Sequence, residues 1–233
     1  MEPVRGIGFD LDHTLAIDNR LEVVAFLRLL ETLLSDGGRT VGTLADEIES
    51  IDELLTRQRR GEFSIDQAVL QFVAERQVEP TREHVAWFRR CAVEMVGEFV
   101  VPLPGAAATL KMLRERGIAV AVLTNGWNPL QARKAQRAGF QGPILVSSEI
   151  GVQKPAPRAF EMLLGALGTP PESAWFVGDS PQSDVAGAHA AGMRAVWINW
   201  EGKTYPQELA PPEYTISQFD RLLELLPSPA KVT

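Results

Sequence analysis

The sequence of 233 residues contains a single cysteine, Cys91. One cysteine cannot form a disulfide within the chain or build a thiolate metal cluster, so both kinds of site are excluded. Basic residues are also few: 23 lysines and arginines stand against 30 aspartates and glutamates, giving a net charge of −7. Such a chain lacks the basic surface by which proteins bind nucleic acids or anionic membranes non-specifically. We therefore expect neither a nucleic-acid polymer nor a membrane among its partners.

Long hydrophobic runs are absent as well. No apolar stretch approaches the roughly 18 residues that a membrane-spanning helix needs. The first residues, Met-Glu-Pro-Val-Arg, have neither the charged nor the apolar region of a signal peptide. We therefore predict a cytoplasmic protein. Hydrophobic residues make up 45% of the chain and charged residues 23%, and these fractions are typical of a folded globular protein.

Residues 17–100 have the periodicity of helices and no pattern typical of strands. Leu21, Val24, Leu27 and Leu30 recur at helical spacing, and three further segments of similar spacing follow them. Glycines, or residues that commonly begin helices, separate these segments. The stretch is predicted to be an all-helical insertion.

The remaining residues, 1–16 and 101–233, are predicted to form an α/β core. Residues 4–9 are an apolar run typical of a buried strand. After residue 101, short apolar strands alternate with helices, most of which end at a glycine. This alternation predicts a parallel sheet with helices on both faces. Residues 227–233 are predicted to be a frayed tail.

Polar residues follow the predicted strands at their carboxyl ends, where doubly wound sheets bind ligands. Any one of them has a common structural explanation, because aspartates after strands also cap helices and form turns. Carboxylates, a lysine and a threonine at successive strand ends are a much stronger signal. The set comprises Asp10 and Asp12, Thr124 with Asn125, Lys154, and Asp179 with Asp184.

These residue types together predict a phosphoryl-transfer site. Asp10 and Asp179 offer hard oxygen ligands for Mg²⁺, which would reduce the repulsion between Asp10 and a phosphate dianion. Asp10 is then the predicted nucleophile, forming an aspartyl phosphate. Asp12 is predicted to protonate the leaving oxygen and later to take a proton from the attacking water.

The other polar residues are predicted to hold the phosphoryl group or the residues around it. Thr124 supplies a hydroxyl and Lys154 a positive charge for the phosphoryl oxygens. We expect Asn125 to bind substrate beside them. Asp184 is expected to hold Lys154 or a water on the metal without binding the metal itself.

At these positions the sequence resembles the haloacid dehalogenase-like (HAD) hydrolase superfamily. This resemblance implies a Rossmann-like core, in which the backbone carbonyl of Asp12 also binds Mg²⁺. It further implies that residues 17–100 form a mobile helical cap. The segments around Thr124 and Lys154 look most like those of nucleotidases, sugar-phosphate phosphatases and phosphoglycolate phosphatases. The four motifs that carry the resemblance are Asp10-Leu11-Asp12-His13-Thr14, Thr124, Lys154, and Gly178-Asp179 with Asp184.

The resemblance also bears on the leaving group. The dehalogenase branch of the superfamily lacks an acid at the position of Asp12, because a halide leaves without a proton. Asp12 therefore favours an oxygen leaving group and hence phosphate. Together with the predicted metal site, this predicts Mg²⁺-dependent hydrolysis of a small phosphorylated metabolite, a phosphomonoester. Two alternatives stay open: a phosphomutase that returns the phosphoryl group from Asp10 to a sugar, and a phosphate-binding protein without turnover. Substrate choice is expected to come from the helical insertion, with Arg57, Arg60 and Gln67 as candidates.

Overall fold

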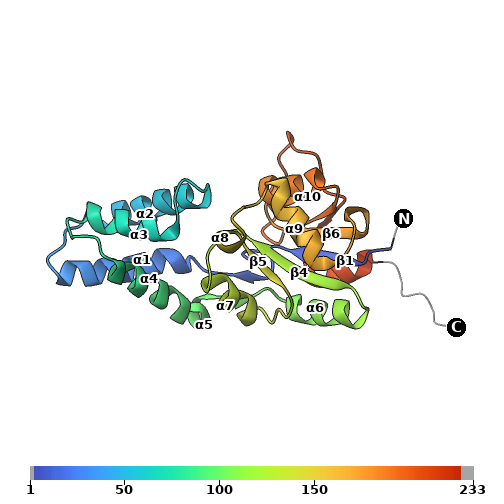
Figure 1. Cartoon of the computed structure of the whole chain (residues 1–233), viewed down its shortest axis with the longest axis horizontal. Helices are drawn as coiled ribbons and strands as arrows, with labels where there is room; N and C mark the ends of the chain where they lie inside the picture. Colours follow the sequence, from blue (N-terminus) through green and yellow to red (C-terminus); the bar gives the residue numbers. More distant parts are fainter. Residues whose placement is uncertain (1–2, 227–233) are drawn as a thin grey trace. The chain divides into compact units, whose positions relative to one another are not determined.

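A computed structural model describes residues 3–226, in two compact units (Figure 1). The α/β unit comprises the chain up to Ile17 and from Val101 onward, and the helical unit is Asp18–Val100. The predicted frayed tail, residues 227–233, lies outside the described residues. None of the described helices is long and apolar enough to cross a membrane.

The α/β unit is built on a six-stranded sheet in which all neighbouring strands are parallel. Its strand order is β5-β4-β1-β6-β7-β8. The chain therefore runs outward from β1 on one side and then returns to build the other side. The carboxyl ends of β4, β1 and β6 meet where this reversal occurs, which is where doubly wound sheets bind ligands. The strands are β1 Gly6–Phe9, β4 Ala119–Thr124, β5 Ile144–Val146, β6 Ala174–Gly178, β7 Arg194–Ile198 and β8 Tyr214–Ile216.

Helices cover both faces of this sheet, as the alternating sequence pattern predicted (Figure 1). Every residue of β1 is buried, as expected for a strand covered on both sides. On one face, a Cβ on Gly8 would come within 2.8 Å of Phe176 and would also overlap Leu163 of the covering helix α9 (Pro157–Leu167). On the other face, the Phe9 ring stacks on Phe219 with 5.8 Å between centroids. The predicted α/β fold with a parallel sheet is therefore confirmed.

The remaining elements of the α/β unit are a short ribbon, the helices and three turns. A two-stranded antiparallel ribbon joins the segments that lead to and from the helical unit, pairing Ala16 with Pro102 and Ile17 with Val101. The ribbon strands are β2 Ala16–Ile17 and β3 Val101–Pro102. The helices are α6 Ala106–Glu115, α7 Leu130–Arg137, α8 Ser147–Ile150, α9 Pro157–Leu167, α10 Ala186–Ala190 and α11 Leu222–Leu225, with short turns η1 Pro171–Ser173, η2 Pro181–Val185 and η3 Phe219–Arg221.

The helical unit packs its amphipathic helices around a small aromatic cluster. The Phe26 ring lies 4.9 Å from Phe72 and 4.4 Å from Phe88, centroid to centroid. At the start of α3, Ser64 and Gln67 form a reciprocal capping box, which satisfies two backbone N–H groups at the helix end. The helices are α1 Leu21–Ser35, α2 Leu44–Arg59, α3 Ile65–Glu75, α4 Arg82–Glu94 and α5 Val96–Phe99.

Candidate active site

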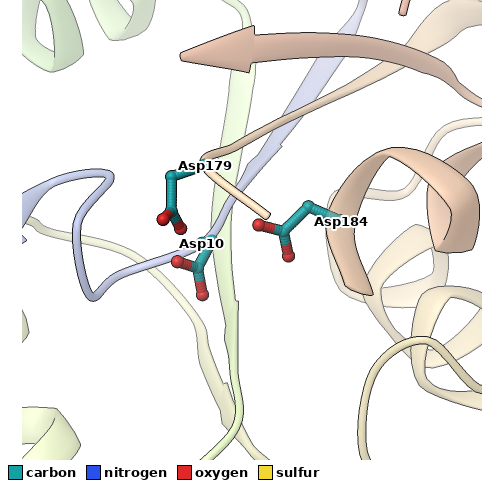
Figure 2. A group of neighbouring side chains, drawn as sticks. All are labelled: Asp10, Asp179 and Asp184. Atoms are coloured by element: carbon teal, nitrogen blue, oxygen red, sulfur yellow. The ribbon is translucent and has the colours of Figure 1, made fainter. Parts of the chain in front are cut away.

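Three carboxylates converge at the carboxyl edge of the sheet in the α/β unit (Figure 2). Asp10 follows β1 and Asp179 follows β6, while Asp184 lies in the turn η2. One carboxylate oxygen of each lies within 4.8 Å of the others. Lys154 reaches the same place from the loop before α9, and its Nζ donates to Asp10 Oδ1 at 2.5 Å and to Asp184 Oδ1 at 2.7 Å. Carboxylates therefore outnumber the lysine in this cluster.

The electrostatics of the cluster reflect its burial first and its excess of negative charge second. Burial raises the pKa of Asp10 to about 7, and the charge of Asp184 adds to the effect although Lys154 opposes it. Burial likewise raises the pKa of Asp179 to about 8, with Asp10 and Asp184 contributing. Burial lowers the pKa of Lys154, but Asp10 and Asp184 outweigh it, so the net shift is upward. The lysine stays charged while two carboxyls lack a compensating cation.

Asp184 is held at both of its oxygens. Its Oδ2 accepts a hydrogen bond from the backbone N–H of Ser180 at 2.9 Å, and its Oδ1 accepts the bond from Lys154. A Cβ on Gly178 would overlap the Asp184 carboxylate, so this approach requires a glycine at position 178. The side chain is thereby fixed beside Lys154, one of the two partners that the sequence analysis expected for it.

Asp10 is oriented by a residue for which the sequence analysis named no role. The buried Thr14 hydroxyl donates to Asp10 Oδ2 at 3.2 Å, while Lys154 occupies Oδ1. The loop that carries Thr14 is closed by the backbone N–H groups of Leu15 and Ala16, which both donate to the Leu11 carbonyl. Thr14 stands in the first motif, and its place in that motif is the signal that could have found it.

The end of β4 supports Lys154 through paired hydrogen bonds. The Asn125 side-chain amide donates to the Lys154 carbonyl at 3.0 Å, and its Oδ1 accepts from the Lys154 N–H at 2.9 Å. The adjacent Thr124 is buried, and its hydroxyl lies 3.5 Å from the Asn125 carbonyl. The amide of Asn125, expected to bind substrate, therefore contacts the backbone of the lysine loop.

The sequence matches the family model of haloacid dehalogenase-like hydrolases over residues 4–192. The chain belongs to this family. A phosphoserine phosphatase from Thermus thermophilus is 50% identical over 99 residues, which are 41% of this chain and 40% of that protein. A glyceraldehyde 3-phosphate phosphatase from Pyrococcus furiosus is 29% identical over 233 residues, 97% of this chain and 94% of that protein. The Thermus match thus spans less than half of either protein.

Solved structures of HAD hydrolases share the fold. The crystal structure of the HAD-hydrolase YfnB from Bacillus subtilis, bound to magnesium, superposes with a TM-score of 0.73 and covers 97% of this chain and all of that one. Sequence identity between the two is 22%. At this identity the likeness shows the architecture of the HAD fold and leaves activity to be argued from the site.

Asp12 of the first HAD motif has its carboxylate bound by helix α7. Lys134 Nζ donates to Asp12 Oδ1 at 2.9 Å, and Gln131 Nε2 donates to Asp12 Oδ2 at 3.0 Å. The sequence analysis named neither residue. Lys134, Ala135 and Ala138 follow Gln131 by three, four and seven residues, which places all four on one helical face. Two long polar residues on an otherwise apolar face of a short helix are the signal that could have found them.

Proposed function

We propose that the protein is a Mg²⁺-dependent phosphatase, which hydrolyses a small phosphorylated metabolite through an aspartyl phosphate on Asp10. The observation that carries this proposal is the arrangement around Asp10. Lys154 and Thr14 orient its carboxylate, and the surrounding carboxylates leave an unbalanced negative charge. Relatives named as phosphatases of phosphoserine and of glyceraldehyde 3-phosphate support the same class of reaction.

The donor set around Asp10 fits Mg²⁺. Carboxylate oxygens of Asp10 and Asp179 lie close enough to share an ion, and hard oxygen ligands suit this cation. These two side chains, with the backbone carbonyl of Asp12, would hold it. When bound, the cation offsets the repulsion between Asp10 and a phosphate dianion. Asp184, whose oxygens already accept from Lys154 and Ser180, keeps the lysine in place.

The proposed reaction has two steps. An Asp10 oxygen attacks phosphorus, the bond to the leaving oxygen breaks, and Asp12 gives that oxygen its proton. Water then attacks the aspartyl phosphate and passes a proton to Asp12, which releases inorganic phosphate and restores Asp10. Lys154 and the Thr124 hydroxyl stabilise the phosphoryl oxygens during both steps. The proton on Asp12 is needed because an alkoxide is a poor leaving group, whereas a halide leaves without one.

Phosphate release tests the proposal directly. With Mg²⁺ and p-nitrophenyl phosphate we expect continuous release of inorganic phosphate, which EDTA stops and added Mg²⁺ restores. Rapid acid quenching followed by intact-mass spectrometry should detect one phosphoryl group on the wild-type protein and none on Asp10→Asn. A phosphomutase would instead transfer the group to a sugar phosphate with little release. Full activity in EDTA would contradict the metal site, and phosphate release by Asp10→Asn at the wild-type rate would contradict the covalent step.

A further inference from the structure

Two residues from one turn of helix α7 donate hydrogen bonds to the carboxylate of Asp12. Lys134 and Gln131 are three residues apart, and each donates to a different oxygen of Asp12. Both donors are buried, with exposures of 1% for Lys134 and 4% for Gln131, whereas the Asp12 side chain is 27% exposed. A buried ammonium is costly unless a carboxylate accompanies it. Asp12 supplies that carboxylate, although it lies more than a hundred residues away in the chain.

The local backbone is shaped for this contact. A Cβ on Gly126 would overlap the side-chain amide of Gln131, and Gly126 has a φ of 153°, which favours glycine. The Gln131 amide also donates to the Asn125 carbonyl at 3.2 Å. Two acceptors facing one atom identify it as the NH₂ group rather than the oxygen. At the helix start, the Asn128 side chain accepts from the N–H of Ala132 at 3.2 Å.

We propose that Lys134 and Gln131 are positioning residues that aim Asp12 at the leaving oxygen and at the attacking water. The proposal rests on the function proposed above, in which Asp12 transfers protons. Each carboxylate oxygen has two lone pairs, and each donor from α7 occupies one of them. A second site on each oxygen therefore stays free for proton transfer. The two bonds fix the direction of the carboxylate without blocking its chemistry.

The orientation of Asp12 matters because the rate of proton transfer falls steeply when the reacting group is misplaced. A shift of about 1 Å in a reacting group can cost on the order of 10²-fold in rate. Without α7, the partly exposed Asp12 side chain would rotate freely and form hydrogen bonds with water. Loss of this orientation should lower the rate most for substrates whose leaving oxygen depends on protonation. It should lower the rate least for substrates whose leaving group departs as a stable anion.

Substitutions on α7 test this dependence. Lys134→Met and Gln131→Met remove one donor each while keeping similar length, and Arg133→Met on the exposed side of the same helix is the matched control. We would measure kcat/KM with Mg²⁺ for an alkyl phosphate and for aryl phosphates of graded leaving-group pKa. We expect losses of about 10- to 100-fold on the alkyl phosphate and several-fold less on p-nitrophenyl phosphate. Arg133→Met should match the wild type on every substrate.

A uniform loss across leaving groups would assign α7 a merely structural role and overturn the proposal. A double-mutant cycle with Asp12→Asn gives a second criterion. If Lys134 acts through Asp12, adding Lys134→Met to Asp12→Asn should lower kcat/KM for the alkyl phosphate by no more than about twofold. A double variant whose loss equals the product of the two single losses would contradict this. Thermal unfolding checks that each variant folds. Should Lys134→Met not fold, Gln131→Met, which removes a neutral donor, carries both criteria.

The failure of this inference can be told apart from failure of the proposed function. If Asp12→Asn shows a leaving-group-dependent loss but the α7 variants do not, only the positioning role is wrong. If Asp12→Asn leaves every substrate unaffected, or if the wild-type protein with Mg²⁺ releases no phosphate, then both proposals fall together.

Discussion

Each unit of the protein contains a buried group of charged side chains, and the two groups differ in their balance of charge. In the helical unit, the guanidinium of Arg76 pairs with Glu47, and both are almost fully buried. Arg76 also donates to the Phe72 carbonyl at 2.9 Å, and Glu47 accepts from the Val41 N–H at 2.7 Å. Each charge therefore has an opposite charge and a further hydrogen bond, as a buried pair requires.

The cluster around Lys154 in the α/β unit leaves its buried charges unbalanced. Lys154 stands among Asp10, Asp179 and Asp184, and the pKa values of Asp10 and Asp179 rise to about 7 and about 8, mainly through burial. Buried charges that are paired within the chain are tolerated by a fold, whereas an uncompensated excess of buried charge is typical of functional sites. Neutralising one carboxylate should therefore have opposite effects on stability in the two units.

Asp10→Asn should produce the largest effect on activity. We expect turnover to fall by at least about 10³-fold, because the amide is no useful nucleophile. Without metal, the same change should raise the melting temperature near neutral pH, since it removes one of the crowded carboxylates. Steady-state phosphate release and thermal unfolding measure the two effects. A variant that kept more than a few per cent of activity would contradict the covalent mechanism.

Glu47→Gln makes the equivalent change in the helical unit and should act in the opposite direction. Breaking a buried pair by removing one partner costs about 3–5 kcal/mol, so urea unfolding should show a loss of this size. The double variant Glu47→Leu, Arg76→Met should recover most of it, because an apolar pair leaves no unpaired charge. If Glu47→Gln left stability unchanged, the contrast between the two units would be wrong.

The sequence reveals this contrast only in part. The strand periodicity and the polar strand ends are local patterns, so the parallel sheet and the candidates Asp10, Asp12, Thr124, Lys154, Asp179 and Asp184 could be named from them. Partners distant in the chain could not. Arg76 with Glu47, and Lys134 with Asp12, are separated by 29 and 122 residues. Nothing in either local segment specifies that such charges meet, because surface helices also carry lysine, arginine and glutamate.

The pH dependence of stability should sharpen the contrast between the two units further. Unfolded Asp10 and Asp179 titrate near 3.8, and folding raises their pKa values to about 7 and about 8. Between these values the folded, metal-free protein holds protons that the unfolded chain has lost. Its free energy of unfolding should therefore fall as pH rises, by at most about 1.4 kcal/mol per pH unit for each proton.

Mg²⁺ competes with those protons, so its stabilising effect should grow with pH. We expect the rise in melting temperature on adding Mg²⁺ to increase from about pH 5 to about pH 8. The double variant Asp10→Asn, Asp179→Asn is the control, and it should show little Mg²⁺ effect at any pH. A Mg²⁺ effect that decreased over this range would contradict the assignment of these two carboxyls.

The smallest expected effect concerns residues first considered for substrate choice. Gln67 Oε1 accepts from the Ser64 N–H at 2.8 Å, and Arg57 pairs with Glu62 at 2.8 Å, so both side chains are engaged within the helical unit. Gln67→Ala should therefore cost about 1 kcal/mol in urea unfolding and leave the order of preferred phosphomonoesters unchanged. The exposed Arg60 has no such bond among the described contacts, and Arg60→Ala should alter that order. If Gln67→Ala changed the order of preferred phosphomonoesters without lowering stability, Gln67 would again be a candidate for contact with the substrate.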